Sequence, residues 1–368
     1  MAAPRVPTAG GAQPAGPDGS NAHVMRSSSQ TSLFESDDGD GAEDGIPRAS
    51  TPLAAVMPAP CDPQILDLAS RLHARWQGRL HLGTSSWHFP GWAGRIWARP
   101  YPEALLSRQG LSAYARHPLM RCVSLDRAFY RPLDEAAYAG LAAQVPPDFR
   151  FVVKAPALVT DAQLREPGSG APLRDNAGFL DARAAVESVV RPALAGLGER
   201  LGVLVFQISP LPARLLHDEA GWHARLEALA AAVSEALQGR ALAALEVRDA
   251  DALAPALAAL LRRHGWRCCL GLHDRMPAAE AQLPMQRALW PGDLVCRWNL
   301  HAGLRYNEAR DAWAPFDRLR AEDPPTRSTL ARVARATLEA GHRVFITINN
   351  KAEGSAPASV MALARCLA

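Results

Sequence analysis

The chain has 368 residues, of which 48% are hydrophobic and 21% charged, close to the average of soluble globular proteins. This composition excludes collagen-like and wholly disordered proteins, and the length suits one α/β barrel of about 250 residues with extensions. The 40 basic and 37 acidic side chains give a net charge of +3, too small a surplus to indicate nucleic-acid binding by charge alone.

Residues 1–60 have the composition of a disordered tail. They contain eight prolines, seven glycines and a single aromatic residue, Phe34, so they bury too little apolar surface to offset the entropy lost on ordering. Three arginines against seven acids give the tail a charge of −4, which leaves +7 for residues 61–368.

No signal for export, a membrane or a cofactor stands out. The chain has no run of about 18 apolar residues and no apolar core after Arg5, so we expect a cytoplasmic protein without membrane contact. Its six cysteines form no C-x-x-C pair, which argues against a zinc ribbon or a disulfide framework. Gly196 and Gly198 precede an expected strand instead of following it, so we expect no dinucleotide cofactor.

From residue 63 the sequence alternates between helical and strand patterns. Ile65, Leu68, Leu72 and Trp76 are spaced by three and four residues, which predicts a helix over 63–76. Short apolar runs follow at 79–84, 121–125, 150–154, 203–207, 244–248, 269–273, 293–297 and 344–348. Helical stretches lie between and after them at 102–115, 134–144, 176–194, 219–238, 252–264, 326–340 and 356–367. Eight such strands predict an α/β fold, a TIM-type (β/α)8 barrel over residues 61–368, with a doubly wound open sheet as the alternative.

Polar residues gather where the expected strands end, which in such a barrel is the side that carries the chemistry. Charges there are costly unless they are paired or solvated, so we interpret this ring as a candidate site, with salt bridges that close the barrel top as the alternative. Its members are Asp126, Arg131, Lys154, Gln207, Glu246, Arg248, His273, Asp274, Arg297, Asn299, Asn349 and Asn350.

Only two of the 40 basic residues are lysines, Lys154 and Lys351. A lysine amine is compact and loses its proton when it is desolvated near other cations, which a guanidinium does not do. Lys154, expected beside Arg131, Arg248 and Arg297, is therefore a candidate base or Schiff-base nucleophile. Anion binding and a purely structural ammonium are the two alternatives.

The number and positions of the acids in the ring exclude two classes of site. A glycosidase needs two facing carboxylates, and the ends of the fourth and seventh strands offer an amide and an arginine instead. A metal site would have to use Asp126, Glu246, His273 and Asp274, whose cationic neighbours oppose a divalent ion, so we predict none.

Three connections on this side are candidates for ligand contact. The first, after residue 84, contains Trp87 and two further tryptophans, as a stacking wall or as the packed core of a loop. Residues 166–172 suit a lid or a tolerated insertion, and residues 300–313 mix arginine and aromatic residues. For 300–313 we favour a solvated surface loop over a base- or sugar-binding loop.

Six segments resemble, in order, the landmarks of domain-of-unknown-function family 72, the YecE-like proteins. They are G-T-S-S-W-H-F-P-G-W (83–92), A-F-Y-R (128–131), F-R-F-V-V-K-A (149–155), V-F-Q-I-S-P (205–210), A-L-E-V-R-D (244–249) and I-N-N-K-A-E-G-S-A-P (348–357). The resemblance covers about residues 80–367 and implies a TIM-type barrel, but no established reaction. The positions that match the family pattern are Trp87, Tyr130, Arg131, Lys154, Gln207, Glu246, Arg248, Asn349 and Asn350.

The chain departs from the family pattern at four positions. Ser86 replaces a glycine, Ser124 an acid and Asp126 an asparagine, and Asp161 stands where a histidine commonly follows a threonine. The loss of an acid and a histidine weakens the expectation of a family-type general acid or base.

Our leading hypothesis is an enzyme-like barrel that binds a small phosphorylated or carboxylated substrate at its mouth. In this hypothesis Lys154 and Glu246 are catalytic, and Lys154 also binds the anion together with Arg131, Arg248 and Arg297. Asn349 and Asn350 orient the substrate, Gln207 is a further binding residue, and Trp87 and Tyr130 form a wall. The alternatives are a nucleic-acid-binding or metal-dependent nucleic-acid-processing barrel, and a non-catalytic protein that binds a partner through its acidic tail. The sequence leaves the oligomeric state open.

Overall fold

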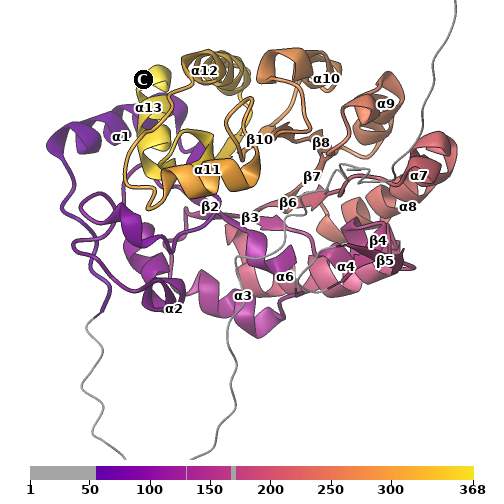
Figure 1. Cartoon of the computed structure of the whole chain (residues 1–368), viewed down its shortest axis with the longest axis horizontal. Helices are drawn as coiled ribbons and strands as arrows, with labels where there is room; N and C mark the ends of the chain where they lie inside the picture. The colour runs from indigo at the N-terminus through magenta and orange to yellow at the C-terminus, as the bar shows by residue number, and fades with distance from the viewer. Residues whose placement is uncertain (1–54, 130, 167–170) are drawn as a thin grey trace, which may run out of the picture.

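A computed structural model of the chain describes residues 55–129, 131–166 and 171–368. Parallel strands form the centre and helices surround them (Figure 1). The strands are β1 (Leu80–Thr84), β2 (Cys122–Leu125), β3 (Arg150–Lys154), β6 (Leu201–Gln207), β7 (Leu242–Glu246), β8 (Arg267–Cys268), β9 (Leu270–Leu272), β10 (Leu294–Trp298) and β11 (Val344–Ile348). A separate antiparallel pair follows β3 and consists of β4 (Gln163–Arg165) and β5 (Pro172–Asp175).

The helices follow the strands in alternation. They are α1 (Pro63–Trp76), α2 (Glu103–Tyr114), α3 (Glu135–Ala142), α4 (Ala157–Thr160), α5 (Ala182–Ala185), α6 (Arg191–Leu197), α7 (Ala213–His217), α8 (Glu219–Leu237), α9 (Pro255–Arg263), α10 (Leu283–Ala288), α11 (Tyr306–Trp313), α12 (Pro324–Glu339) and α13 (Ala356–Leu367). A π-helical stretch, Val186–Val190, links α5 to α6.

The two ends of the sheet are joined by the chain itself. The strand order is β8-β7-β6-β3-β2-β1-β11-β10-β9, and Cys269 alone separates β8 from β9. Residues 267–272 thus form one interrupted strand that pairs with β7 on one side and β10 on the other. The backbone N–H of Cys269 donates to the carbonyl of Leu245 (2.8 Å) across the interruption. The result is a nearly closed parallel barrel, so the predicted barrel is confirmed and the open-sheet alternative is wrong.

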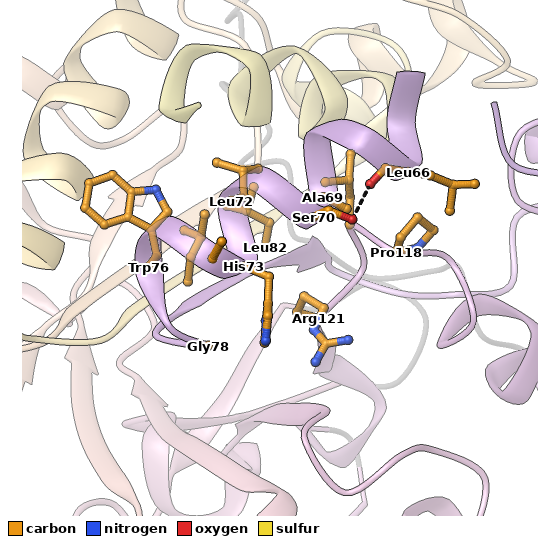
Figure 2. A pocket seen from close by; sticks show the side chains of 13 residues that line it. Leu66, Ala69, Ser70, Leu72, His73, Trp76, Gly78, Leu82, Pro118 and Arg121 are labelled. Atoms are coloured by element: carbon orange, nitrogen blue, oxygen red, sulfur yellow. Dashed lines mark hydrogen bonds between the residues drawn. The ribbon is translucent and has the colours of Figure 1, made fainter. Parts of the chain in front are cut away.

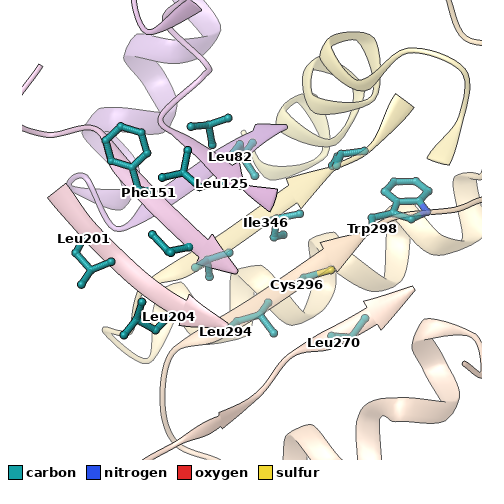
Figure 3. Close-up of a cluster of buried hydrophobic side chains, with 14 of the residues drawn as sticks. Leu82, Leu125, Phe151, Leu201, Leu204, Leu270, Leu294, Cys296, Trp298 and Ile346 are labelled. Carbon is teal, nitrogen blue, oxygen red and sulfur yellow. The ribbon is translucent and has the colours of Figure 1, made fainter. Parts of the chain in front are cut away.

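Alternation along each strand divides the core into two parts. Leu294, Cys296 and Trp298 of β10 face the surrounding helices, together with apolar residues of the neighbouring strands (Figure 3). Val295, between them, belongs to a second cluster that fills the lumen with Val152, Val203, Val205, Ala244, Cys269 and Phe345. Because side chains alternate with a period of two, Arg297 also points into the lumen.

The predicted helix 63–76 is confirmed as α1, and its ends have identifiable causes. The carboxylate of Asp62 accepts from the N–H of Gln64 (2.8 Å), Pro63 occupies the first turn, and Gln77 ends the helix in the left-handed conformation. The buried face docks the helix on the barrel, where the indole of Trp76 donates to the carbonyl of Leu367 (3.2 Å).

The expected disordered tail, residues 1–60, lies outside the described residues except for its last six. These six are anchored to the connection after β1: Val56 is buried, and the N–H of Met57 donates to the hydroxyl of Tyr101 (3.0 Å). The N–H of Ala59 donates to the carbonyl of Ile96 (2.8 Å).

Arginines precede or begin seven of the eight barrel strands, and many of them hydrogen-bond to backbone carbonyls at this end. Arg79, for example, donates to the carbonyls of Trp76 (3.3 Å) and Leu338 (2.7 Å), where α1 and α12 end. A guanidinium carries five donors in a planar fork, so it suits this role better than a lysine. The residues are Arg79, Arg121, Arg150, Arg200, Arg240, Arg267 and Arg343.

One loop prediction is revised, and a second stays a prediction. Residues 306–313, for which we favoured a solvated loop, form α11, because Ala309 and Trp313 pack in a small apolar cluster with Leu300 and Phe316. Residues 166–172 connect the β4–β5 pair, and 167–170 lie outside the described residues. Among the described residues, no helix combines the length and apolar character needed to cross a bilayer.

Candidate functional site

Five charged side chains meet in the lumen at the carboxyl ends of the strands. Lys154 ends β3, Glu246 ends β7, and Arg297 lies one residue before the end of β10. Asp126 directly follows β2, and Arg248 lies two residues beyond Glu246, on the same side of the extended chain. We call these five residues the mouth cluster.

Arg297 crosses the lumen and joins two carboxylates. Its Nη1 donates to Oε2 of Glu246 (2.7 Å), and its Nη2 contacts both carboxylate oxygens of Asp126 (2.7 and 2.8 Å). Only 2% of the Arg297 side chain is exposed, against 32% for Asp126. Burial alone lowers the pKa of Arg297, but the two carboxylates outweigh it and raise the pKa above its usual range. Arg297 is therefore a permanent cation.

Glu246 is held ionised between two arginines. Its Oε1 lies 2.7 Å from Nη2 of Arg248, as a close ion pair without good hydrogen-bond alignment. Burial alone raises the pKa of Glu246, but Arg248 and Arg297 outweigh it and lower the pKa to about 2. Nη2 of Arg248 also donates to Oε1 of Gln207 (3.0 Å), which fixes the fork between β6 and β7.

Lys154 is the exception in the mouth cluster. Within the described part of the chain its amine has no ion-pair partner, and it lies 3.5 Å from the ring centroid of Phe129. The residue is 7% exposed. Burial lowers its pKa to about 7, with Arg297 and Arg248 adding to the shift and Asp126 and Glu246 opposing it. Two guanidiniums already balance the two carboxylates, so the ammonium is the surplus charge and is the group that loses its proton.

Several buried donors near the mouth have no acceptor among the described residues. They are Nε and Nη1 of Arg248, Nε of Arg297 and Nδ2 of Asn299. An unsatisfied buried donor costs about 1–3 kcal/mol, more when it is charged. These atoms are shielded from solvent, so an incoming acceptor reaches them only after neighbouring side chains shift.

The other residues predicted for the site differ in burial and in their hydrogen-bond partners. Trp87, after β1, is buried, and the guanidinium of Arg127 lies 4.7 Å from its ring centroid. The side-chain amide of Asn349 donates to Oγ of Ser85 (2.8 Å). Asn350 instead accepts from the indole of Trp92 (3.1 Å) and the N–H of Ala356 (2.9 Å), which ties its carbonyl oxygen to the turn before α13. Arg131 is exposed, and Tyr130 lies outside the described residues.

Two residues that we had noted without a binding role belong to the same site. Asp126, noted as a departure from the family pattern, is a direct partner of Arg297, and Ser124 on the same strand face donates to its Oδ1 (2.6 Å). His273, at the end of the interrupted strand, forms a close pair with Asp274. Burial and the nearby Arg248 lower the pKa of His273 to about 3, so its ring is neutral near pH 7.

The acids considered for a metal are engaged with other groups. Asp126 and Glu246 bind Arg297, and His273 pairs with Asp274. Over residues 55–129, 131–166 and 171–368, no group of three or more His, Cys, Asp or Glu side chains is arranged to hold an ion.

A hollow of about 360 Å³ lies at the opposite end of the barrel (Figure 2). Leu66, Leu72 and Trp76 of α1 line it together with Pro118 and Arg121, which precede β2. Its walls are mainly apolar, and none of the mouth cluster lines it.

Comparisons with known proteins identify a family for this chain. The family described as "Protein of unknown function DUF72" matches residues 81–368. A crystal structure of a DUF72 family protein from Enterococcus faecalis V583 is 15% identical, with a TM-score of 0.49, and the match covers 78% of this chain and 95% of that one. One from Thermotoga maritima MSB8 is 20% identical, with a TM-score of 0.47, and covers 77% and 96%. No curated protein matches the chain.

Proposed function

Since this chain belongs to the family of proteins of unknown function DUF72, we propose its function from the barrel mouth itself: the mouth binds a small carboxylate- or phosphate-bearing ligand beside Lys154. The observation that carries this proposal is the charge balance of the mouth cluster. Three cations face two carboxylates, and Lys154 is the cation without an ion-pair partner among the described residues.

An anion at this position stabilises the cluster in two ways. It pairs with the Lys154 ammonium, which burial otherwise disfavours, and so raises the pKa of that amine. It also supplies an acceptor for the unused donors of Arg248 and Arg297, once the covering side chains move. Arg131, exposed after β2, is available to a ligand that approaches from that side.

Glu246 receives a different role from the one expected from the sequence. We expected a general acid or base, but a carboxylate held between two guanidiniums with a pKa of about 2 is a poor proton acceptor near neutral pH. We propose that Glu246 positions Arg248 and Arg297, and that Lys154, with a pKa of about 7, is the group that exchanges a proton with the ligand.

Thermal unfolding of the full chain at fixed ionic strength tests this proposal. A ligand at a hundred times its dissociation constant stabilises the folded state by about 2.7 kcal/mol. Carboxylates, inorganic phosphate and sugar phosphates form the anion arm, and wild type, Lys154→Met and Lys351→Met form the protein arm. We expect a small anion to raise the melting temperature of wild type and Lys351→Met, but not of Lys154→Met.

Three outcomes contradict the proposal. An equal anion effect in Lys154→Met places the ligand elsewhere. A shift with oligonucleotides alone, which falls steeply as salt rises, favours the nucleic-acid alternative. A shift with divalent metals alone, lost in Asp126→Asn, favours a metal site.

A further inference from the structure

Lys154 has the surroundings of a covalent nucleophile as well as those of an anion-binding cation. We propose that its amine forms a Schiff base with the carbonyl carbon of the bound anion, so that the ligand is an aldehyde or ketone that also carries a carboxylate or phosphate. This inference rests on the proposed function, because the anionic group holds the carbonyl against Lys154.

The Lys154 amine is placed near two acids without being held by either. An amine attacks a carbonyl only through a free lone pair, and an ammonium locked in a salt bridge does not supply one. The nearby carboxylates, Asp126 and Glu246, are instead bound to guanidiniums at 2.7 Å. Lys154 therefore shares the lumen with two acids and has no close ion pair to either among the described residues.

Burial and the fixed cations of the mouth cluster favour a neutral amine at Lys154. The two guanidiniums remain protonated, and in the reactive complex the anionic end of the ligand pairs with them and not with Lys154. The pKa of Lys154 then stays near 7, so part of the amine is neutral at pH 7. The imine that forms can take up a proton and become a cation. That cation lies over the Phe129 ring, where the ammonium now lies at 3.5 Å, with the two carboxylates nearby.

The covalent step balances without any further reactant. The nitrogen lone pair forms the C–N bond, the carbonyl π electrons move to oxygen, and one amine proton passes to that oxygen to give a carbinolamine. The hydroxyl then leaves with the second amine proton as water, and the C=N bond forms. Buried Arg248 and Arg297 hold the anionic group during both steps.

The sequence offers an internal control. Lys351 is the only other lysine of the chain. It too is buried, with 2% exposed, and burial lowers its pKa to about 8. Its amine lies over the rings of Tyr306 (4.0 Å) and Phe316 (5.5 Å), outside the mouth cluster. Low exposure and a depressed pKa are thus shared by both lysines, and the neighbouring anion site distinguishes Lys154.

Reductive trapping of the full chain with sodium cyanoborohydride tests the proposal, because the reagent delivers hydride to an iminium carbon and leaves a stable secondary amine. The probes are pyruvate for a carboxylated ketone and dihydroxyacetone phosphate for a phosphorylated one. Acetone is the carbonyl without an anion. Peptide mass mapping at pH 7 then compares Lys154, Lys351 and the N-terminal amine in the same sample.

We expect at least one anionic probe to label Lys154 at least tenfold more than Lys351, and acetone to show only the smaller preference that follows from the lower pKa of Lys154. The preferred probe distinguishes a carboxylate from a phosphate ligand. Lys154→Met should retain only the N-terminal and Lys351 background. Equal labelling of the two lysines by both anionic probes overturns the proposal.

Lactate and glycerol 3-phosphate, which lack the carbonyl, separate this inference from the proposed function. If they stabilise wild type but not Lys154→Met, and no Lys154 adduct forms, the anion site stands and the Schiff base is wrong. If they have no effect and no adduct forms, both are wrong. If Lys154→Met fails to fold, acetylation of wild-type Lys154 is measured with and without lactate or glycerol 3-phosphate. Protection of Lys154 from acetylation then gives the same information as the variant.

Discussion

Nη1 of Arg297 lies 2.7 Å from Oε2 of Glu246, and this contact joins β10 to β7 across the interrupted strand between them. Arg297 also reaches Asp126 after β2, so one guanidinium braces three positions around the lumen. A buried charge pair of this kind adds little net stability when intact, but the loss of one partner leaves an uncompensated charge. The effect of these ion pairs on stability is therefore best measured by removing one partner.

Glu246→Gln tests the brace. The amide keeps the shape of the side chain but leaves Arg248 and Arg297 without their shared counter-ion, so we expect the free energy of unfolding to fall by about 3–5 kcal/mol. Urea unfolding at pH 7 measures the change. Glu187→Gln, which removes an exposed ion pair with Arg183 on the outer surface, is the control and should leave the midpoint unchanged. A loss below about 1 kcal/mol in Glu246→Gln contradicts a charge-paired brace.

The lowered pKa of Lys154 predicts a pH-dependent difference in stability. Between about pH 7 and the ordinary lysine value of 10.5, the folded protein binds fewer protons at this amine than the unfolded chain does. The free energy of unfolding of wild type should therefore rise with pH relative to Lys154→Met, by at most about 1.4 kcal/mol per pH unit. Urea unfolding of both proteins at pH 7, 8 and 9 checks this.

Lys351→Met serves as the comparison for that experiment. The pKa of Lys351 is lowered to about 8, so the difference between wild type and Lys351→Met should begin to rise about one pH unit higher. A flat difference between wild type and Lys154→Met from pH 7 to 9 would show that the Lys154 amine is not desolvated.

Gly83 lies in β1 where it pairs with Cys122 of β2. A Cβ atom at Gly83 would lie 1.8 Å from the backbone carbonyl oxygen of Cys122, so Gly83→Ala must separate two strands that share only a short pairing. We expect a loss above the 1–3 kcal/mol typical of overpacking. A Cβ atom added at Gly140 in α3 would have no described atom within 4 Å, so Gly140→Ala should instead raise the free energy of unfolding by about 0.5–1 kcal/mol. Similar thermal midpoints for the two variants would contradict the close approach of β1 and β2.

The sequence predicted the strands well because each is a short apolar run bounded by polar or turn residues. The sequence placed Lys154, Glu246 and Arg297 at or near strand ends, and the structure adds that alternation turns them into the lumen. The interruption at Cys269 was not predictable, because its residues read as one apolar strand and pairing with two different neighbours is a tertiary property.

The pairing within the mouth was also beyond the sequence. We grouped Arg248 and Arg297 as anion-binding cations, but their closest acceptors are Glu246 and Asp126, which depends on distances across the lumen. α11 was missed since its Ala309 and Trp313 pack on a small cluster formed by residues outside the helix. Local periodicity carries no signal of such contacts.

Asp126 pairs with Arg297 and also acts on the pKa of Lys154. Its substitution should therefore change the stability of the fold and the pKa of Lys154 to different extents. It is 32% exposed, so Asp126→Asn should destabilise the fold less than Glu246→Gln does. Its charge opposes the lowering of the Lys154 pKa, so its removal should lower that pKa further. Competitive acetylation of Lys154 and Lys351 across pH 5–9, followed by peptide mapping, gives the titration midpoint of each amine. A Lys154 midpoint that is the same in wild type and Asp126→Asn would show that Asp126 acts on Arg297 alone. A fall at Lys154 with no change at Lys351 would show that the carboxylate of Asp126 sets the fraction of neutral amine in the mouth.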